Sequence, residues 1–155
     1  MKEANHTQLL RMIANHPHAR EEITGNPGKV KTLRKAVSRG VYMIYVLRSS
    51  SARVEIWMYR GSRPHQVDEA KEIHAHFRRK KEAIEKAFGS PLNWNHGRRK
   101  TAYSIQHDYD DFDLNNPSAF PEWADRMVAD MNRLHDALKP HFLCCLLYTS
   151  PSPRD

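Results

Sequence analysis

The stretch VYMIYVLRSSSARVEIWMYR, at residues 41–60, limits the possible folds more than any other part of the chain. Its first half, Val41–Arg48, carries β-branched and aromatic residues on both faces, which is typical of a strand inside a sheet. Its second half, Arg53–Tyr59, alternates in the way that is typical of a strand with one covered face. The apolar positions are Val54, Ile56 and Met58, and the other face carries Arg53, Glu55, Trp57 and Tyr59. Because a short serine turn joins the two halves, we expect an antiparallel hairpin.

Two long amphipathic helices are predicted after the hairpin. The segment Gln66–Phe88 has an apolar stripe at helical spacing, made of Ala70, Ile73, Phe77, Ile84 and Phe88. Gly89 follows this segment at the position of a left-handed C-cap. The segment Pro121–Leu138 has a second stripe, made of Trp123, Met127, Met131, Leu134 and Leu138. Pro140 is expected to end this helix.

The remaining patterns complete the predicted fold. A third strand is expected at Ala102–His107, and a short helical pattern covers residues 4–15. The basic segment at residues 29–40 is compatible with helix or loop. We therefore predict an α+β fold in which a small sheet of at least three strands packs against two long helices, with a short N-terminal helical segment. The expected core consists of Val54, Ile56, Ile73, Phe77, Ile84, Phe88, Trp123, Met127, Met131 and Leu134.

Composition and charge narrow the classes of function. At 155 residues, the chain has room for one domain with a modest core. A formal net charge of +7 favours attraction to nucleic acid or another polyanion, without establishing it. No apolar run is long enough to cross a bilayer, so we expect no membrane partner. The two cysteines, Cys144 and Cys145, are adjacent and can hardly bridge each other, so we expect a reducing, cytoplasmic location.

The chain is predicted to have three parts. Residues 1–36 form an N-terminal helical or loop segment that we expect to be truncated, and residues 37–144 form the α+β domain. The last part, Cys145–Asp155, reads CLLYTSPSPRD and continues no upstream pattern, so we expect it to be irregular. It resembles the translation of a common transposon-type sequencing adapter, which indicates a metagenomic source and a natural C-terminus that lies elsewhere.

Several segments carry a resemblance to a known family. They are ARVEIWM at 52–58, KKEAIEKAFGSPLNW at 80–94, TAYSI at 101–105 and PEWADRMVADMNRLHDALKPHF at 121–142. In this order they resemble the bacterial domain of unknown function 4268, and VSRGVYMIYV at 37–46 resembles the strand that precedes them. The resemblance covers about two thirds of the chain and weakens upstream of Val37.

The resemblance implies a role but no established activity. Domains of this family tend to lie at the C-terminal end of longer proteins, some of which have a nuclease-like domain in front. This implies an accessory role in DNA handling or defence. The chain departs from the family at Ser104, where a basic residue commonly precedes the strand isoleucine, so no anion-binding role is carried over to that position.

Two basic clusters and two aromatic residues are the candidate nucleic-acid contacts. The clusters are RRKK at 78–81 and GRRK at 97–100. The residues singled out are Arg78, Arg79, Arg98, Arg99 and Lys100 for phosphates, with Trp57 and Tyr59 as stacking platforms. The alternatives are a solvated helix face for RRKK, because one helix spreads four consecutive residues around its axis, and a core position under a helix for the aromatic pair.

No catalytic, cofactor or metal set emerges from the sequence. Glu69-Ala70-Lys71 matches part of a nuclease motif, but it is predicted in a solvated first helical turn and lacks an acidic strand partner. The acidic stretch at residues 108–113 lacks the glycine and terminal glutamate of a calcium loop. The ten histidines show no zinc spacing and are expected to be exposed.

Two hypotheses follow from these observations. The first is a non-catalytic accessory domain associated with nucleic-acid handling, whose full-length protein carries a nuclease-like domain. The second is a protein-interaction or dimerisation domain in which the basic charge is incidental.

Overall fold

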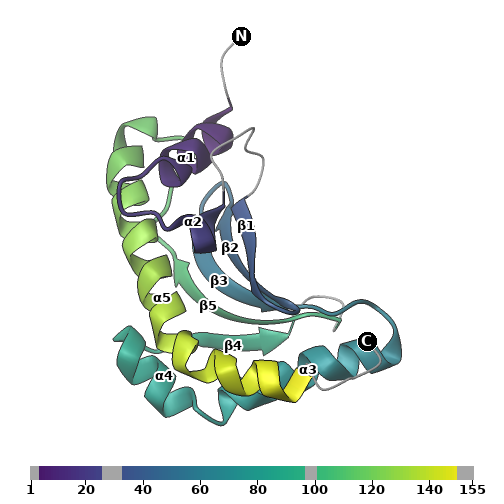
Figure 1. Cartoon of the computed structure of the whole chain (residues 1–155). Coiled ribbons are helices and arrows are strands. Elements are labelled where there is room, and N and C mark those ends of the chain that lie inside the picture. The colour runs from purple at the N-terminus through teal and green to yellow at the C-terminus, as the bar shows by residue number, and fades with distance from the viewer. Residues whose placement is uncertain (1–3, 26–32, 97–100, 150–155) are drawn as a thin grey trace.

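A computed structural model of the chain describes residues 4–25, 33–96 and 101–149, and within them a sheet packs against a layer of helices (Figure 1). The helices are α1 (Asn5–Ala14), α2 (Glu21–Thr24), α3 (Pro64–Arg78), α4 (Lys81–Phe88), the 3₁₀ turn η1 (Pro117–Ala119) and α5 (Phe120–Thr149). The strands are β1 (Leu33–Ser38), β2 (Val41–Leu47), β3 (Ala52–Met58), β4 (Asn93–His96) and β5 (Tyr103–Tyr109). The predicted α+β class is confirmed.

The sheet has five antiparallel strands in the order β1-β2-β3-β5-β4. β2 and β3 form the predicted hairpin, with Val41 opposite Met58 and Leu47 opposite Ala52. β5 is the predicted third strand, and it pairs with β3 along its whole length. Because β2 pairs with one edge of β3 and β5 with the other, β3 is the central strand of the sheet.

The two edge strands were not predicted. β1 forms where the sequence allowed helix or loop, and its residues 34–36 are all exposed, so it shows no apolar alternation. β4 has only four residues, NWNH, and pairs with β5 alone. Both strands exist because their backbones complete the hydrogen bonds of a neighbouring strand, and this pairing leaves little trace in side-chain pattern.

One core lies between the inward face of the sheet and the helices. All ten predicted core residues are buried, namely Val54, Ile56, Ile73, Phe77, Ile84, Phe88, Trp123, Met127, Met131 and Leu134. The core also takes in Leu9 and Ile13 of α1 and Leu33 of β1, so it draws on residues from both sides of position 36. The division of the chain at that position stays a prediction.

The prediction of one continuous helix over Gln66–Phe88 is wrong. The helix stops at Arg78 because the N–H of Lys80 bonds to the carbonyl of Phe77, three residues back, and Lys80 leaves the helical conformation at φ −108° and ψ 20°. The chain turns there and α4 begins, which allows Ile84 and Phe88 to be buried against α5. The predicted left-handed C-cap is confirmed at Gly89, with φ 104°.

The prediction that Pro140 ends the last helix is also wrong. α5 continues to Thr149 with Pro140 inside it. A proline removes one backbone donor and strains one turn, but flanking residues with good helix propensity, such as Leu138 and Leu143, can carry the helix past it. The prediction of irregular structure from Cys145 onward is therefore wrong for residues 145–149. Residues 150–155 lie outside the described part of the chain.

In the described residues, none of the helices combines the length and the apolar character that a membrane-spanning helix would need.

Candidate nucleic-acid interface

Within the described residues, the helices lie on one face of the sheet and leave the other face without a helix. The inward face packs against the helices through aromatic contacts such as His74 with Tyr103 and Phe88 with His107. Figure 1 shows the helices gathered on that side of the curved sheet. Strand alternation sends the other side chains to the opposite face, which we call the uncovered face. Its members from the paired strands include Arg34, Tyr42, Ile44, Val46, Arg53, Glu55, Trp57, Ser104, Gln106 and Asp108, and Tyr59, which stacks on Trp57, continues the face just after β3.

Three aromatic rings and one arginine form what we call the aromatic cluster of the uncovered face: Arg34, Tyr42, Trp57 and Tyr59. Tyr42 and Trp57 are directly opposite in the β2–β3 register, with ring centroids 5.7 Å apart. Trp57 and Tyr59 stack at 5.0 Å with an interplanar angle of 11°. The Arg34 guanidinium lies 5.4 Å from the Tyr42 ring centroid and 5.9 Å from that of Trp57. All three rings are half-buried, so each keeps surface that a ligand can reach.

A tight turn holds the end of this cluster in place. The backbone N–H of Tyr59 donates to the carbonyl of Gly40 at 2.9 Å. Gly40 has φ 74°, and a Cβ at this position would lie 2.1 Å from Cδ of Arg60. The left-handed φ therefore favours glycine in the turn that connects β1 to β2, and a larger residue would also displace the Arg60 side chain. The alternative interpretation of Trp57 and Tyr59, as core residues under a helix, is wrong, because both lie on the uncovered face.

A row of paired polar side chains lies beside the aromatic cluster. Arg53 Nε donates to Glu55 Oε1 at 2.6 Å, and Gln106 Nε2 donates to Asp108 Oδ1 at 2.8 Å. Asn93 donates to the other oxygen of Asp108. Burial raises the pKa of Glu55, although the Arg53 guanidinium acts in the opposite direction. The polar side chains of this half of the face bond to one another, and they include the carboxyl groups of Glu55 and Asp108. The uncovered face therefore has carboxyl groups on one half and the Arg34 cation on the other.

The first basic cluster lies at the turn between α3 and α4. Arg78, Arg79, Lys80 and Lys81 line one hollow of about 600 Å³, which we call the basic hollow. The objection that one helix spreads these residues around its axis does not hold, because α3 ends at Arg78 and α4 begins at Lys81. The second cluster, with Arg98, Arg99 and Lys100, lies outside the described residues.

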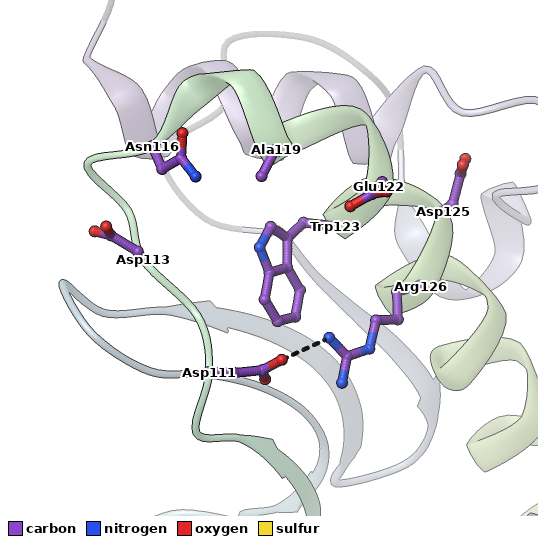
Figure 2. Close-up of a pocket in the computed structure, with 8 residues that line it drawn as sticks. All are labelled: Asp111, Asp113, Asn116, Ala119, Glu122, Trp123, Asp125 and Arg126. Carbon is purple, nitrogen blue, oxygen red and sulfur yellow. Dashed lines mark hydrogen bonds and ion pairs between the residues drawn. The ribbon is translucent and has the colours of Figure 1, made fainter.

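An acidic pocket of about 560 Å³ lies where the loop after β5 meets the start of α5 (Figure 2). Arg126 Nη1 donates to Asp111 Oδ2 at 3.2 Å, and this hydrogen bond lowers the pKa of Asp111. The same guanidinium lies 4.6 Å from the ring centroid of Trp123. Figure 2 shows the carboxylates of Asp113 and Asp125 pointing away from the Arg126 guanidinium. In the described part of the chain, no three His, Cys, Asp or Glu side chains are placed to hold a metal ion.

The expectation that the histidines are exposed is wrong for two of them. His74 and His135 are each only 8% exposed. The ring of His74 lies 5.4 Å from that of Tyr103 and 6.0 Å from that of Trp94, and His135 lies 5.6 Å from Phe142. His74 follows Ile73 and precedes Phe77 by three residues, so its place beside the apolar stripe was a usable signal.

A buried polar network that the sequence did not indicate joins the sheet to α5. Tyr109 Oη donates to Asp130 Oδ2 at 2.6 Å, and Arg133 Nη2 donates to Asp130 Oδ1 at 2.5 Å. His107 Nε2 lies 3.6 Å from Asp130 Oδ2, and Arg133 also donates to the carbonyl of Phe88. Burial and the hydrogen bond to Asp130 raise the pKa of Tyr109 above its ordinary value, so the phenol stays a donor. This network fixes β5, α4 and α5 together.

The fold and its uncovered face define a small α+β domain with an antiparallel sheet. The family model described as "Domain of unknown function (DUF4268)" matches residues 13–142, and the chain belongs to this family. The match begins well upstream of Val37, where the resemblance was expected to weaken, and it takes in α2 and β1. No curated protein matches the chain.

Proposed function

We propose that this domain is a non-catalytic accessory module that binds unpaired nucleic-acid strands on its uncovered face, within a nuclease or defence-type protein of the cytoplasm. The observation that carries this proposal is the aromatic cluster of Arg34, Tyr42, Trp57 and Tyr59, whose half-buried rings lie on a sheet face without a helix.

Unpaired bases suit this surface better than a duplex does. Each base has a flat π-face that can stack on an aromatic side chain, and such stacking contributes about 1–3 kcal/mol per base. In a duplex these π-faces are stacked on one another and unreachable, so the cluster would select single strands. Arg34 adds a cation beside the rings, where a phosphate of the same strand can reach it.

The accessory role is supported by the hydrogen bonds among the polar side chains of the uncovered face. Its polar side chains are paired with each other, as Arg53 is with Glu55 and Gln106 with Asp108, which suits a surface that holds a strand. Cleavage would then belong to a further domain of the full-length protein, and this module would hold the strand for it.

The test is the affinity for a labelled single strand of mixed sequence, measured by fluorescence anisotropy across a salt series. Trp57→Ala should weaken binding by about 5- to 150-fold, the equivalent of one lost stacking contact. Trp57→Phe is the matched control, because it keeps an aromatic ring and should lose much less. Equal affinity of Trp57→Ala and the parent, with both folded, would sink the proposal.

A second candidate is a protein-interaction or dimerisation surface. It is favoured by Ile44 and Val46, which are half-buried apolar residues on the same face, next to a tryptophan, two tyrosines and an arginine. Trp, Tyr and Arg dominate the energetics of protein interfaces. Sedimentation velocity across a concentration series separates the two: a dimer that Trp57→Ala dissociates, without loss of nucleic-acid binding, supports this candidate.

A further inference from the structure

The turn between α3 and α4 brings four consecutive cations to one side of the molecule. Along a continuous helix, residues four apart share a face while their intervening neighbours point elsewhere. Here α3 ends at Arg78, Lys80 takes φ −108° and ψ 20°, and α4 starts at Lys81. As a result, Arg78, Arg79, Lys80 and Lys81 all line the basic hollow, together with Glu82 and Ala83.

These four cations lack the carboxylate partners that other arginines have. Arg20 bonds to Asp136 at 2.7 Å, and Arg126 reaches Asp111 at 3.2 Å. Within the described residues, none of the four side chains of the basic hollow has a carboxylate within 4.0 Å. The hollow therefore carries four positive charges against the single negative charge of Glu82.

Glu82 belongs to the lining of the hollow, and the next acid along α4, Glu85, is engaged elsewhere. Glu85 accepts a hydrogen bond from the backbone N–H of Leu92 at 2.8 Å and another from the indole of Trp94 at 3.0 Å. These bonds, with a smaller contribution from Lys81, lower the pKa of Glu85. Glu85 thus serves to fix the turn into β4, and it offers little neutralisation to the hollow.

The end of α3, beside the hollow, packs against α5. His76 Nε2 lies 3.3 Å from the backbone carbonyl of His141, so the end of α3 and α5 touch at this point. Burial lowers the pKa of His141, and repulsion from His76 and Lys80 lowers it further. The lowered pKa leaves His141 uncharged at pH 7, so α5 adds no positive charge to the hollow at this point.

We infer that the basic hollow is a second nucleic-acid contact, which binds the phosphate backbone without reading bases. Its lining of Arg78, Arg79, Lys80, Lys81, Glu82 and Ala83 contains no aromatic ring that could stack with a base, whereas arginine and lysine are the usual partners of phosphate oxygens. The inference rests on a different observation from the proposed function, and it stands if the aromatic cluster proves to bind protein.

The experiment uses the full chain and a blunt duplex DNA of mixed sequence, whose paired bases cannot stack on the aromatic cluster. Binding is measured across a salt series for the parent, for Arg78→Gln with Arg79→Gln, and for Lys71→Gln with Lys86→Gln. The control pair removes the same charge from exposed positions on α3 and α4 that do not line the hollow. All substituted side chains are exposed and glutamine is a good helix former, so the fold should persist.

The plot of log affinity against log salt has a negative slope, and we expect this slope to become shallower by about 1.8 for the arginine pair. Each lost phosphate contact changes the slope by about 0.9. The lysine pair should change the slope by much less. Equal changes for the two pairs would show a response to net charge alone and overturn the inference. Failure of the parent to bind duplex at the lowest salt would overturn it as well. Trp57→Ala should leave duplex binding unchanged, so the two proposals can fail separately.

Discussion

The hydrogen bond between Tyr109 and Asp130 gives the sharpest prediction about stability. Tyr109 is 2% exposed and Asp130 is 8% exposed, and their oxygens are 2.6 Å apart. Tyr109→Phe removes the donor and leaves Asp130 Oδ2 with only the more distant His107, at 3.6 Å. A hydrogen bond to a charged group contributes about 1.5–3 kcal/mol, so the free energy of unfolding should fall by that amount. The corresponding drop in Tm is about 3–12 °C for a domain of this size.

Urea unfolding followed by circular dichroism measures this change. Tyr42→Phe is the matched control, because its hydroxyl lies on the uncovered face, and it should change the free energy by no more than about 0.5 kcal/mol. Asp130→Asn and the double variant complete a cycle that should show coupling of at least about 1 kcal/mol. An unchanged urea midpoint for Tyr109→Phe would refute the assignment of this network as the link between sheet and α5.

Three further predictions follow from other parts of the structure. Phe77→Ala should lower the free energy of unfolding by about 3–5 kcal/mol, because Phe77 of α3 is fully buried and its ring packs against Phe142 of α5. A loss below about 1 kcal/mol, measured by urea unfolding, would contradict its core position. Arg20 lowers the pKa of Asp136 to about 2, so the folded state gains stability above the ordinary pKa of 3.8 and loses it as pH falls toward 2. Exposure limits this gain to less than about 1 kcal/mol, and acid titrations should show the parent's advantage over Asp136→Asn complete above pH 3.8 and lost as pH falls to 2. Replacing Arg98 and Arg99 should flatten the salt dependence of nucleic-acid binding by about one unit each, and unchanged slopes would remove these two residues from the interface.

Side-chain pattern predicted the parts of the fold that bury a regular face. The alternation around Val54 and Ile56 placed β3 correctly, and the stripe from Ile73 to Phe88 identified the buried positions of α3 and α4, because burial requires that spacing. The pattern could not locate the break at Lys80, since Phe77 before it and Ile84 after it remain at helical spacing. It also missed β1 and β4, whose strand character comes from backbone pairing at the edges of the sheet.

The candidate site was predictable only in part. The alternation in β3 placed Trp57 and Tyr59 on one face, but Tyr42 and Arg34 join them through the register of β1, β2 and β3, which no local pattern contains. The hollow at residues 78–81 depends on the same unpredicted break between α3 and α4. Asp130 and Tyr109 are 21 residues apart, so their hydrogen bond was equally invisible in the sequence.

The most direct test of the account is ultraviolet cross-linking of the chain to a single strand, with the modified peptides identified by mass spectrometry. The account predicts cross-links to bases at Trp57, Tyr59 or Tyr42, because these rings would be in stacking contact with the strand. Trp57→Ala should abolish most of the signal from β3, while an excess of duplex should not compete for it. Cross-links confined to the basic hollow or to residues 97–100, with none on β2 or β3, would contradict the account.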